Sequence, residues 1–207
     1  MILVFDILLI VLLFGLFGIA HSFLASVKIK QKITESAGSR IAFYRLFYNI
    51  ISFILFIVVY EISPKPDVII YDLNPPFDLI IVGLQVLSFI GILWAGSFVN
   101  LKEFLGISQV IRYMKNEYDT SELDEHQQLI TKGPFKFSRH PIYFFSILFI
   151  GLRPTMDLFY LVMFACLTVY FYAGSYFEEK KLAAKFGQTY IDYQKNVPRI
   201  FPIKFGK

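Results

Sequence analysis

The chain has 207 residues, of which 56% are hydrophobic, and its formal net charge is +4. With a mean hydropathy of +0.58, this composition excludes an ordinary soluble enzyme, and membrane topology explains the positive charge better than nucleic-acid binding does. An open sheet would leave unsatisfied edges in lipid, and no train of alternating strands indicates a barrel. We therefore expect an all-α, polytopic integral membrane protein that forms a single domain over residues 1–207.

Five apolar runs approach or partly fill the length that crosses a bilayer, about 20 residues. They cover residues 1–25, 41–60, 77–100, 141–152 and 155–177. The first run contains Asp6 and no lysine or arginine, unlike the positive start of a cleaved signal peptide, so we expect a retained helix. GLRPTMD separates the last two runs, which predicts a tight turn and a helical hairpin over 141–177.

The basic residues lie on one side of the predicted spans. Seventeen lysines and arginines fall in the segments 26–40, 101–140 and 178–207, whereas the segments 61–76 and 152–157 hold one each. This asymmetry predicts that the three basic segments face the cytoplasm. With five spans, the N-terminus is then outside and the C-terminal tail is cytoplasmic.

The fourth apolar run begins directly after two basic side chains. In GPFKFSRHPIYF (133–144), Pro141 suits the first position of a helix and biases His140 toward an extended backbone. The free amide groups of a helix start attract anions, and Arg139 adds a fixed positive charge. The pattern indicates a receptor for a carboxylate or a phosphate, with ordinary interfacial snorkelling of the arginine as the alternative.

The fifth run ends at two acidic residues, Glu178 and Glu179. Apolar residues at helical spacing follow them, which predicts an amphipathic interfacial helix that runs through Gly187. A hairpin would place this acidic pair at the same membrane level as Arg139 and His140. The pair then either forms a mixed-charge site with those two residues or is a solvated flank that pairs with nearby lysines.

Two blocks of the sequence together resemble the isoprenylcysteine carboxyl methyltransferases and their membrane-methyltransferase relatives, which include phospholipid and thiol methyltransferases. The first block, LITKGPFKFSRHPIYF, supplies Gly133, Phe135, Arg139, His140, Pro141 and Tyr143 to the family pattern. The second, EEKKLAAKFGQTYIDYQKNVPRIFP, supplies Glu178, Glu179, Leu182, Phe186, Gly187, Tyr190 and Tyr193. The combination and order of the two blocks are specific.

The resemblance implies a methyltransferase that binds S-adenosylmethionine on the cytoplasmic side, within residues 101–202. It implies cofactor contacts from Gly133, Phe135, Arg139, His140, Pro141, Tyr143, Glu178 and Glu179. It also assigns catalytic roles to Arg139, Glu178 and Arg199. Prenylcysteine enzymes commonly carry an arginine before the Val-Pro of the tail, where this chain has Asn196. Either Arg199 takes that role or the acceptor is not a carboxylate.

The expected acceptor is a small lipophilic molecule that enters from the bilayer, with membrane lipids around the protein and no nucleic acid as partner. An isoprenylcysteine-type carboxylate is the first expectation, and thiol S-methylation or lipid-amine N-methylation is the alternative. A neutral thiol or amine needs a general base, for which His140 or a glutamate is the candidate. Alignment of the reactants and exclusion of water would contribute most of the rate.

The remaining histidines and the cysteine have simpler interpretations. The only cysteine, Cys166, lies within an apolar run and allows neither an internal disulfide nor a cysteine-based metal site, and we expect no metal. His21 ends the first span and is expected to bond to backbone at the interface, and His126 is expected to be solvated. Two other readings stay open: a b-haem protein ligated by His21 and His140, and a non-enzymatic membrane sensor or scaffold.

Overall fold

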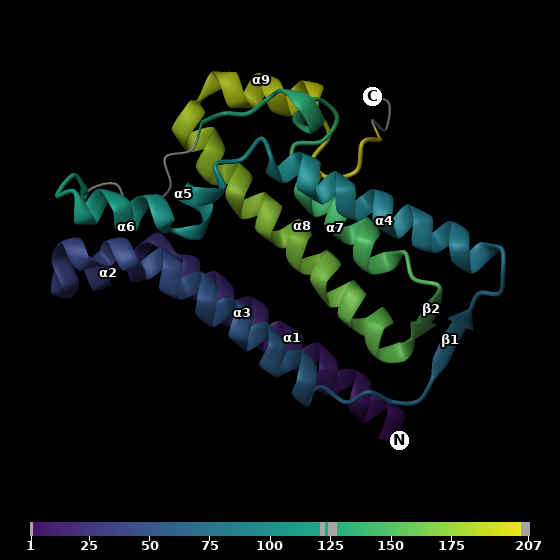
Figure 1. The fold of residues 1–207 in the computed structure, drawn as a ribbon. Helices are drawn as coiled ribbons and strands as arrows, with labels where there is room; N and C mark the ends of the chain where they lie inside the picture. Colours follow the sequence, from purple (N-terminus) through teal and green to yellow (C-terminus); the bar gives the residue numbers. More distant parts are fainter. Residues whose placement is uncertain (1, 121–122, 124–127, 204–207) are drawn as a thin grey trace. The chain divides into compact units, whose positions relative to one another are not determined.

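The computed structural model describes residues 2–120, 123 and 128–203, and helices dominate them (Figure 1). In chain order the elements are α1 (Ile2–Ala25), α2 (Val27–Ala37), η1 (Gly38–Phe43), α3 (Tyr44–Ile62), β1 (Ile69–Asp72), α4 (Phe77–Gly96), α5 (Leu101–Leu105), α6 (Ile107–Met114), η2 (Gly133–Lys136), α7 (Pro141–Gly151), β2 (Thr155–Asp157), α8 (Leu158–Phe186) and α9 (Gln188–Asn196). The expected all-α fold class is confirmed.

Four helical segments in the described part of the chain are long and apolar enough to cross a membrane. They are α1, the continuous segment Val27–Ile62, α4 and α8. The polytopic membrane protein expected from the composition is therefore confirmed. α7 has 11 residues and rises only about 16 Å, so a fifth crossing stays a prediction. α8 has 29 residues, about 43 Å, so its second half extends beyond an apolar core of about 30 Å.

The chain forms two compact units. The larger unit comprises residues 1–11, 64–99 and 129–207, and the smaller unit comprises residues 12–63 and 100–128. The larger unit holds α4, α7, α8, α9 and both strands, and the smaller unit holds α2, α3, α5 and α6. A single domain over the whole chain stays a prediction.

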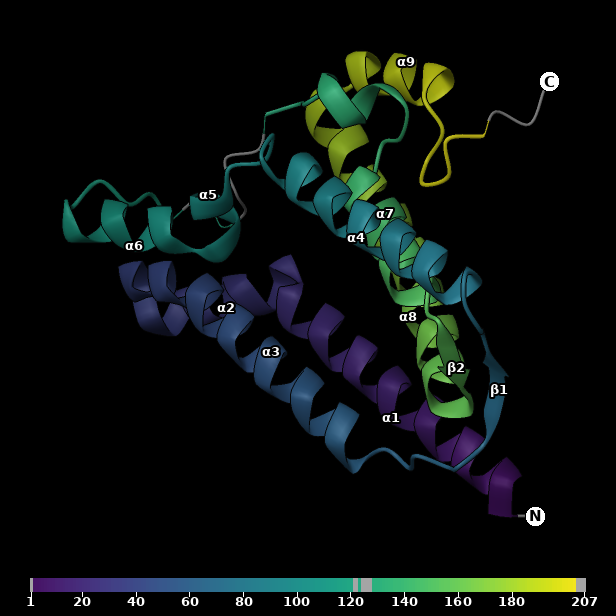
Figure 2. The same ribbon diagram turned by 45° about the vertical axis from the view of Figure 1, so that its right-hand side comes forward.

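Small residues on α4 allow α7 to pack closely against it, and the two helices lie side by side in Figures 1 and 2. Gly91 and Ala95 are buried, and a Cβ atom on Gly91 would lie 2.4 Å from the Phe145 ring. Gln85 Nε2 also donates to the carbonyl of Phe149 at 3.0 Å. Small residues and interhelical hydrogen bonds of this kind hold helices together in lipid, and here they fix the short α7 in place.

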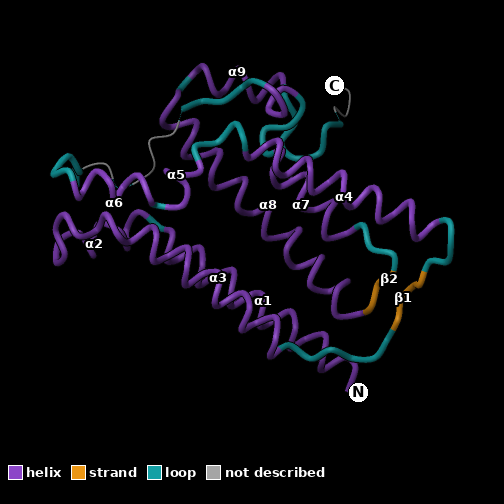
Figure 3. The backbone as a smooth tube through the Cα atoms, viewed as in Figure 1, coloured by secondary structure: helices purple, strands orange, loops and turns teal. Residues whose placement is uncertain are grey.

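The connection between α7 and α8 differs from the predicted tight turn, because part of it is a strand. β2 pairs with β1 in an antiparallel two-stranded sheet (Figure 3). The Thr155 hydroxyl donates to Asp72 Oδ1 at 2.6 Å, and the amide of Leu158 donates to the carbonyl of Val68 at 2.9 Å. The pairing satisfies backbone groups of two loops at once, and the helical hairpin itself is present as expected.

The predicted amphipathic helix after Glu178 is wrong in its extent, because α8 continues to Phe186 and a separate helix follows. Gly187 has φ +57°, a conformation that glycine adopts at little cost and that ends a helix. Its amide donates to the carbonyl of Ala183 at 3.0 Å. α9 then turns back across the end of α8 (Figure 2).

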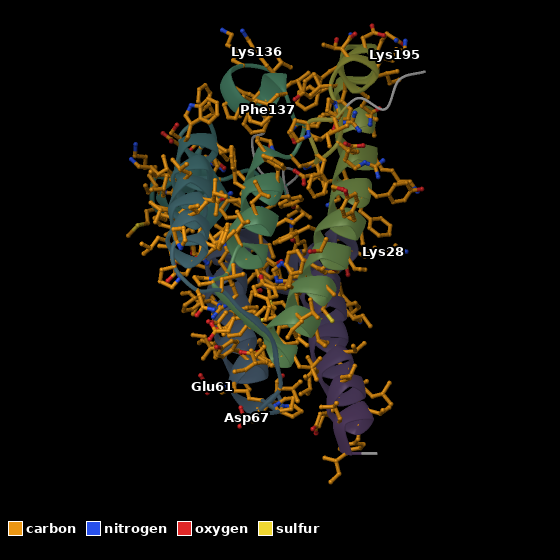
Figure 4. All side chains as sticks on the ribbon, turned by 90° about the vertical axis from the view of Figure 1, so that its right-hand side faces the viewer. Lys28, Glu61, Asp67, Lys136, Phe137 and Lys195 are labelled. Atoms are coloured by element: carbon orange, nitrogen blue, oxygen red, sulfur yellow. The ribbon has the colours of Figure 1, made fainter. Side chains whose placement is uncertain are left out.

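Charged side chains mark the two ends of the larger unit. Figure 4 shows Lys136 and Lys195 at the end that carries η2 and α9, and Asp67 at the opposite end. The start of α7 belongs to the end with the lysines.

Candidate functional site

The candidate site lies where α7 begins, within the larger unit, and the chain after α9 completes it. We call residues 197–201 the C-terminal strap. The amide of Arg139 donates to the carbonyl of Pro198 at 2.9 Å, and the amide of His140 donates to that of Arg199 at 3.0 Å. The Ser138 hydroxyl donates to the carbonyl of Ile200 at 2.8 Å. The strap therefore lies along residues 138–140 like a neighbouring strand.

Aromatic packing holds the far end of the strap. The ring of Phe201 lies 5.8 Å from that of Phe144 on α7, edge to face, and 6.3 Å from that of Tyr172 on α8. These distances are typical of stabilising aromatic pairs. The strap thus joins the two helices of the hairpin at their charged end.

Arg139 joins α8, α9 and the strap. Its Nε and Nη2 donate to the two carboxylate oxygens of Glu179 at 2.6 and 3.1 Å. Its Nη1 donates to the carbonyl of Gln194 at 2.9 Å and to that of Val197. These bonds use four of the five N–H groups of a guanidinium, and the side chain is only 9% exposed. Arg139 is therefore placed to position other residues of the site.

Glu179 is the buried centre of the same network. Only 3% of the residue is exposed. Besides Arg139, its carboxylate accepts from Gln194 Nε2 at 3.1 Å and from Arg199 Nε at 3.2 Å. Removing a buried charge from water is costly unless it is paired and hydrogen-bonded, and here both conditions are met.

His140 lies between the two glutamates of α8. Its Nε2 is 3.3 Å from Glu179 Oε1, and its Nδ1 is 3.5 Å from Glu178 Oε2. The ring nitrogens of His140 thus face one carboxylate each. The Tyr143 hydroxyl also donates to Glu178 Oε2, at 3.2 Å. The Glu178 side chain is 39% exposed, so its negative charge is accessible at the surface of this otherwise buried cluster.

A short stack of rings runs from His140 along the hairpin. The rings of His140 and Tyr143 are 5.2 Å apart and nearly parallel, at 7°. The rings of Tyr143 and Phe171 are 5.1 Å apart at 19°. Aromatic faces attract cations, and the hydroxyl of the middle ring reaches Glu178. The carboxylate of Glu178 and the rings of this stack therefore lie next to each other.

Arg199 is the more accessible of the two arginines in the site. Its side chain is 38% exposed, although Nε is engaged by Glu179. Its guanidinium carbon lies 5.8 Å from the ring centroid of Tyr176. The structure thus presents an exposed cation and the exposed carboxylate of Glu178 on either side of the buried Glu179.

The other sequence-predicted residues lie in the supporting shell of this cluster. Gly133 has φ +58°, and a Cβ atom there would lie 2.4 Å from the Phe98 ring, so only glycine fits. The carbonyl of Phe135 accepts a hydrogen bond from the Tyr193 hydroxyl at 2.6 Å. Pro141 is buried at the first position of α7. Direct contact of these residues with a cofactor stays a prediction.

Two tyrosines of α9 differ in their hydrogen bonding. Burial raises the pKa of Tyr193 to about 12, with nearby Arg139 opposing the rise. Burial also raises the pKa of Tyr190, and nearby Glu179 adds to the rise. The Tyr190 hydroxyl finds no hydrogen-bond partner among residues 2–120, 123 and 128–203. The sequence pattern marks both tyrosines equally, so the difference between them emerges only from the structure.

Sequence reasoning missed Ser138, Gln194 and the backbone of the strap as parts of the site. Most of the strap contacts use carbonyl groups, which every residue carries, so no side-chain type signals them. Gln194 lies in a polar stretch of α9, with lysine and asparagine beside it. Only its spacing from Tyr190, one turn earlier, places it on the face that meets α8.

Of the other two histidines, the structure describes His21. His21 belongs to the smaller unit, where Nδ1 is 2.9 Å from the Ser52 hydroxyl and Nε2 is 2.7 Å from the Tyr48 hydroxyl. His126 lies outside the described residues. The side chains beside both nitrogens of His21, and those beside both nitrogens of His140, argue against axial ligation of haem. No group of three potential metal ligands forms within the described ranges.

The comparison with protein families identifies the class of protein that carries this site. The sequence profile of the phospholipid methyltransferase family matches residues 84–189, just over half of the chain, and the match includes α7 and α8. The chain therefore belongs to the phospholipid methyltransferase family. Enzymes of this family use S-adenosylmethionine as methyl donor. The enzyme class and the cofactor expected from the sequence are both confirmed at the level of the family.

Individual relatives of the chain have a more narrowly defined activity than the family as a whole. Methanethiol S-methyltransferase 1 of Bradyrhizobium diazoefficiens is 26% identical over 92% of this chain and 65% of that protein. Methanethiol S-methyltransferases of Crocosphaera subtropica and Pseudomonas deceptionensis are 28% and 27% identical, over 72% and 71% of their lengths. The chain thus spans about two thirds of the first relative. No solved structure is significantly similar to it.

Proposed function

We propose that this chain is a membrane-embedded methyltransferase that transfers the methyl group of S-adenosylmethionine to a small lipophilic thiol. One observation carries the proposal: the partly exposed Glu178 carboxylate lies against Tyr143 and His140 and is held in place through the buried Glu179. Exposed charge on a rigid, buried support is what a site needs to bind and align a polar ligand.

The chemistry of the donor set fits the cofactor. S-adenosylmethionine carries a cationic sulfonium, an ammonium and a carboxylate, and when bound it supplies an electrophilic methyl carbon. The partly exposed carboxylate of Glu178 suits the cationic groups. Arg199 suits the carboxylate, because its guanidinium is partly exposed and forms paired hydrogen bonds with anions. Arg139 holds this arrangement through Glu179, so we assign it a positioning role.

A thiol acceptor also needs a place for its proton, and the cluster provides one. His140 and Tyr143 both contact the same oxygen of Glu178, Oε2, so we assign Oε1 to the acceptor. Glu178 takes the proton as the thiol becomes a thiolate. His140 stays between the two carboxylates and holds Glu178 in a fixed orientation, which is the usual requirement for a general base.

The arginines of the site favour a thiol over an isoprenylcysteine-type carboxylate, which was the first expectation from the sequence. Arg139 and Arg199 both bond to Glu179. Asn196 stands where prenylcysteine enzymes commonly have an arginine, and its side-chain amide donates to the carbonyl of Asp192. If Arg199 holds the cofactor carboxylate, no further cation of the strap remains for an acceptor carboxylate. The similarity to methanethiol S-methyltransferases supports the same choice.

The site lies at the cytoplasmic face in this proposal, with the N-terminus outside and the acceptor entering from the bilayer. Lys136 and Lys195 lie at the same end of the larger unit as the start of α7 (Figure 4), and basic residues favour the cytoplasmic side. Glu178 comes 20 residues after the start of α8, a rise of about 30 Å, which matches the apolar thickness of a bilayer.

Labelled methyl transfer by purified protein in lipid nanodiscs tests the proposal. Labelled S-adenosylmethionine is supplied with one of three acceptors: a small alkyl thiol, an N-acetyl-S-prenylcysteine or phosphatidylethanolamine. We expect labelled thioether and no labelled ester or amine. Transfer to the prenylcysteine or to the lipid amine would overturn the acceptor class. Folded protein that does not bind S-adenosylmethionine or S-adenosylhomocysteine in calorimetric titration would overturn the enzymatic proposal and favour a sensor or scaffold.

A further inference from the structure

The short helices α5 and α6 of the smaller unit have their polar side chains inside and their apolar side chains outside. Glu103 and Gln109 are each only 6% exposed. The exposed apolar side chains are Leu101, Phe104, Leu105, Ile107, Ile111 and Met114, between 39% and 76% exposed. Helices that border water expose their polar side chains and bury their apolar ones.

The buried polar groups satisfy one another. Gln109 Nε2 donates to the carbonyl of Glu103 at 3.1 Å and to its Oε2 at 3.0 Å. Arg112 forms a two-pronged ion pair with the same carboxylate. Gly106, with φ +90°, makes the sharp turn between the helices. The network brings these polar groups together away from the exposed apolar side chains.

α5 is also fixed against the start of the membrane-spanning helix α3. Arg45 Nε and Asn49 Nδ2 both donate to the carbonyl of Phe104, at 2.8 and 3.0 Å. A Cβ atom on Gly106 would lie 2.5 Å from the amide nitrogen of Leu46, so the turn rests on the backbone of α3. The exposed apolar side chains of α5 are therefore held beside the first turns of α3.

Basic side chains border this face. Lys102 is exposed within α5, and Lys115 is exposed directly after α6. Lysine flanking an apolar helix face matches the phosphate groups of a phospholipid leaflet. The apolar set is too continuous for isolated surface residues, and such patches mark sites of contact with another apolar phase.

We infer that α5 and α6 lie within the membrane interface, with Phe104, Ile111 and Met114 among lipid acyl chains and Lys102 and Lys115 at the lipid phosphates. The segment after the third apolar run is thus a membrane-embedded element, although its charges alone would assign it to a cytoplasmic loop. The occupant of the apolar face is the lipid of the same leaflet.

Fluorescence quenching in the full-length protein tests this inference. In a Trp94→Phe background, which removes the only tryptophan, single tryptophans replace Phe104 or Met114. A third variant, Glu117→Trp, serves as the water-exposed control. Each protein is placed in nanodiscs whose lipids are brominated on the upper acyl chain, or in ordinary nanodiscs with iodide added.

We expect the brominated lipids to remove most of the fluorescence of Phe104→Trp and Met114→Trp, and iodide to quench Glu117→Trp alone. Quenching of the first two by iodide would place the face in water and overturn the inference. Protection from both quenchers would mean that protein covers the face, which also overturns it. Circular dichroism confirms in each case that the helices are intact.

Discussion

The described part of the chain contains two buried glutamates, Glu179 in α8 and Glu103 in α5, and comparing them separates the candidate site from a structural ion pair. Both are nearly inaccessible, at 3% and 6% exposure. Both accept two hydrogen bonds from one arginine and another from a glutamine amide. Burial and the pairing with one arginine and one glutamine are therefore common to the two regions.

The difference lies in what surrounds each network. Glu103 pairs with Gln109 and Arg112 of α6, which lie within nine residues of it, and these contacts join two short helices. Glu179 has partners in the segment just before α7, in α9 and in the strap. Next to it are Glu178 and Arg199, whose side chains are each more than a third exposed. A buried ion pair alone is weak support for function. Exposed charge held by such a pair is the more useful sign.

The sharpest test of this comparison is Glu178→Gln. We expect the rate of methyl transfer to a thiol to fall by about 10² to 10⁴-fold, because the residue is the proposed proton acceptor. Thermal unfolding should hardly change, since the side chain is partly exposed. Glu103→Gln is the matched control and should lower the unfolding temperature while leaving the rate intact. Equal rates for Glu178→Gln and the unmodified chain would remove Glu178 from the mechanism.

Arg139→Ala comes next and should affect binding and the strap together. Loss of one partner from a buried pair costs about 3 to 5 kcal/mol, so we expect the affinity for S-adenosylhomocysteine to fall by about 100-fold or more in calorimetric titration. Arg112→Ala should destabilise the smaller unit to a similar degree and keep the affinity. Arg139→Lys keeps the charge and loses the two-pronged geometry. Its affinity for S-adenosylhomocysteine should therefore lie between that of Arg139→Ala and that of Arg112→Ala. Undiminished affinity in Arg139→Ala would refute the positioning role.

Tyr143→Phe should have a smaller effect. It removes the hydroxyl that donates to Glu178, and a hydrogen bond to a charged group at a partly exposed position contributes about 1.5 kcal/mol. We therefore expect kcat/KM for the thiol to fall by about tenfold. Tyr48→Phe removes a comparable hydroxyl beside His21 in the smaller unit and should leave kcat/KM unchanged. Similar losses in both variants would point to a general structural effect.

The two tyrosines of α9 give the smallest expected change. Tyr193→Phe removes the hydrogen bond to the Phe135 carbonyl and should lower the free energy of unfolding by about 1 kcal/mol. Tyr190→Phe should cost less, because its hydroxyl has no partner in the described part of the chain. Chemical denaturation at neutral pH measures both. A larger loss for Tyr190→Phe would contradict the structure.

The raised pKa of Tyr193, about 12, adds a pH dependence. The folded state favours the neutral phenol, so the contribution of this residue is fully present below pH 10, the ordinary pKa of tyrosine, and is lost as the pH rises toward 12. Tyr193→Phe should therefore show a shallower loss of stability over that range than the unmodified chain.

The central residues of the site could be predicted from the sequence because topology brings them together. A hairpin returns the chain to the same membrane level, which is enough to place His140 near Glu178. The unequal roles of the neighbours Glu178 and Glu179 could not be predicted, because adjacent helix positions point about 100° apart and only packing decides which is buried. The role of Arg139 was equally hidden, since two of its acceptors are backbone carbonyls.

The fold likewise has elements that the sequence predicts and elements that it does not. Apolar runs predict α1, α3, α4 and α8 because hydrophobicity determines which segments enter lipid. They cannot predict that β2 pairs with β1, since that pairing depends on two loops meeting. The inward polar face of α5 and α6 also escapes prediction, because helical periodicity reports that two faces differ without stating which one faces the protein.

The strap has a consequence for the biogenesis of the protein. Residues 138–140 find their backbone partners in residues 198–200, about 60 positions later in the chain. On the ribosome, α7 leaves the exit tunnel while the strap, which begins more than 40 residues later, has not yet been synthesised. Arg139 must therefore wait for its backbone partners after α7 has reached the insertion machinery. Membrane integration and closure of the candidate site are then two successive events, and a nascent chain can complete the first without the second.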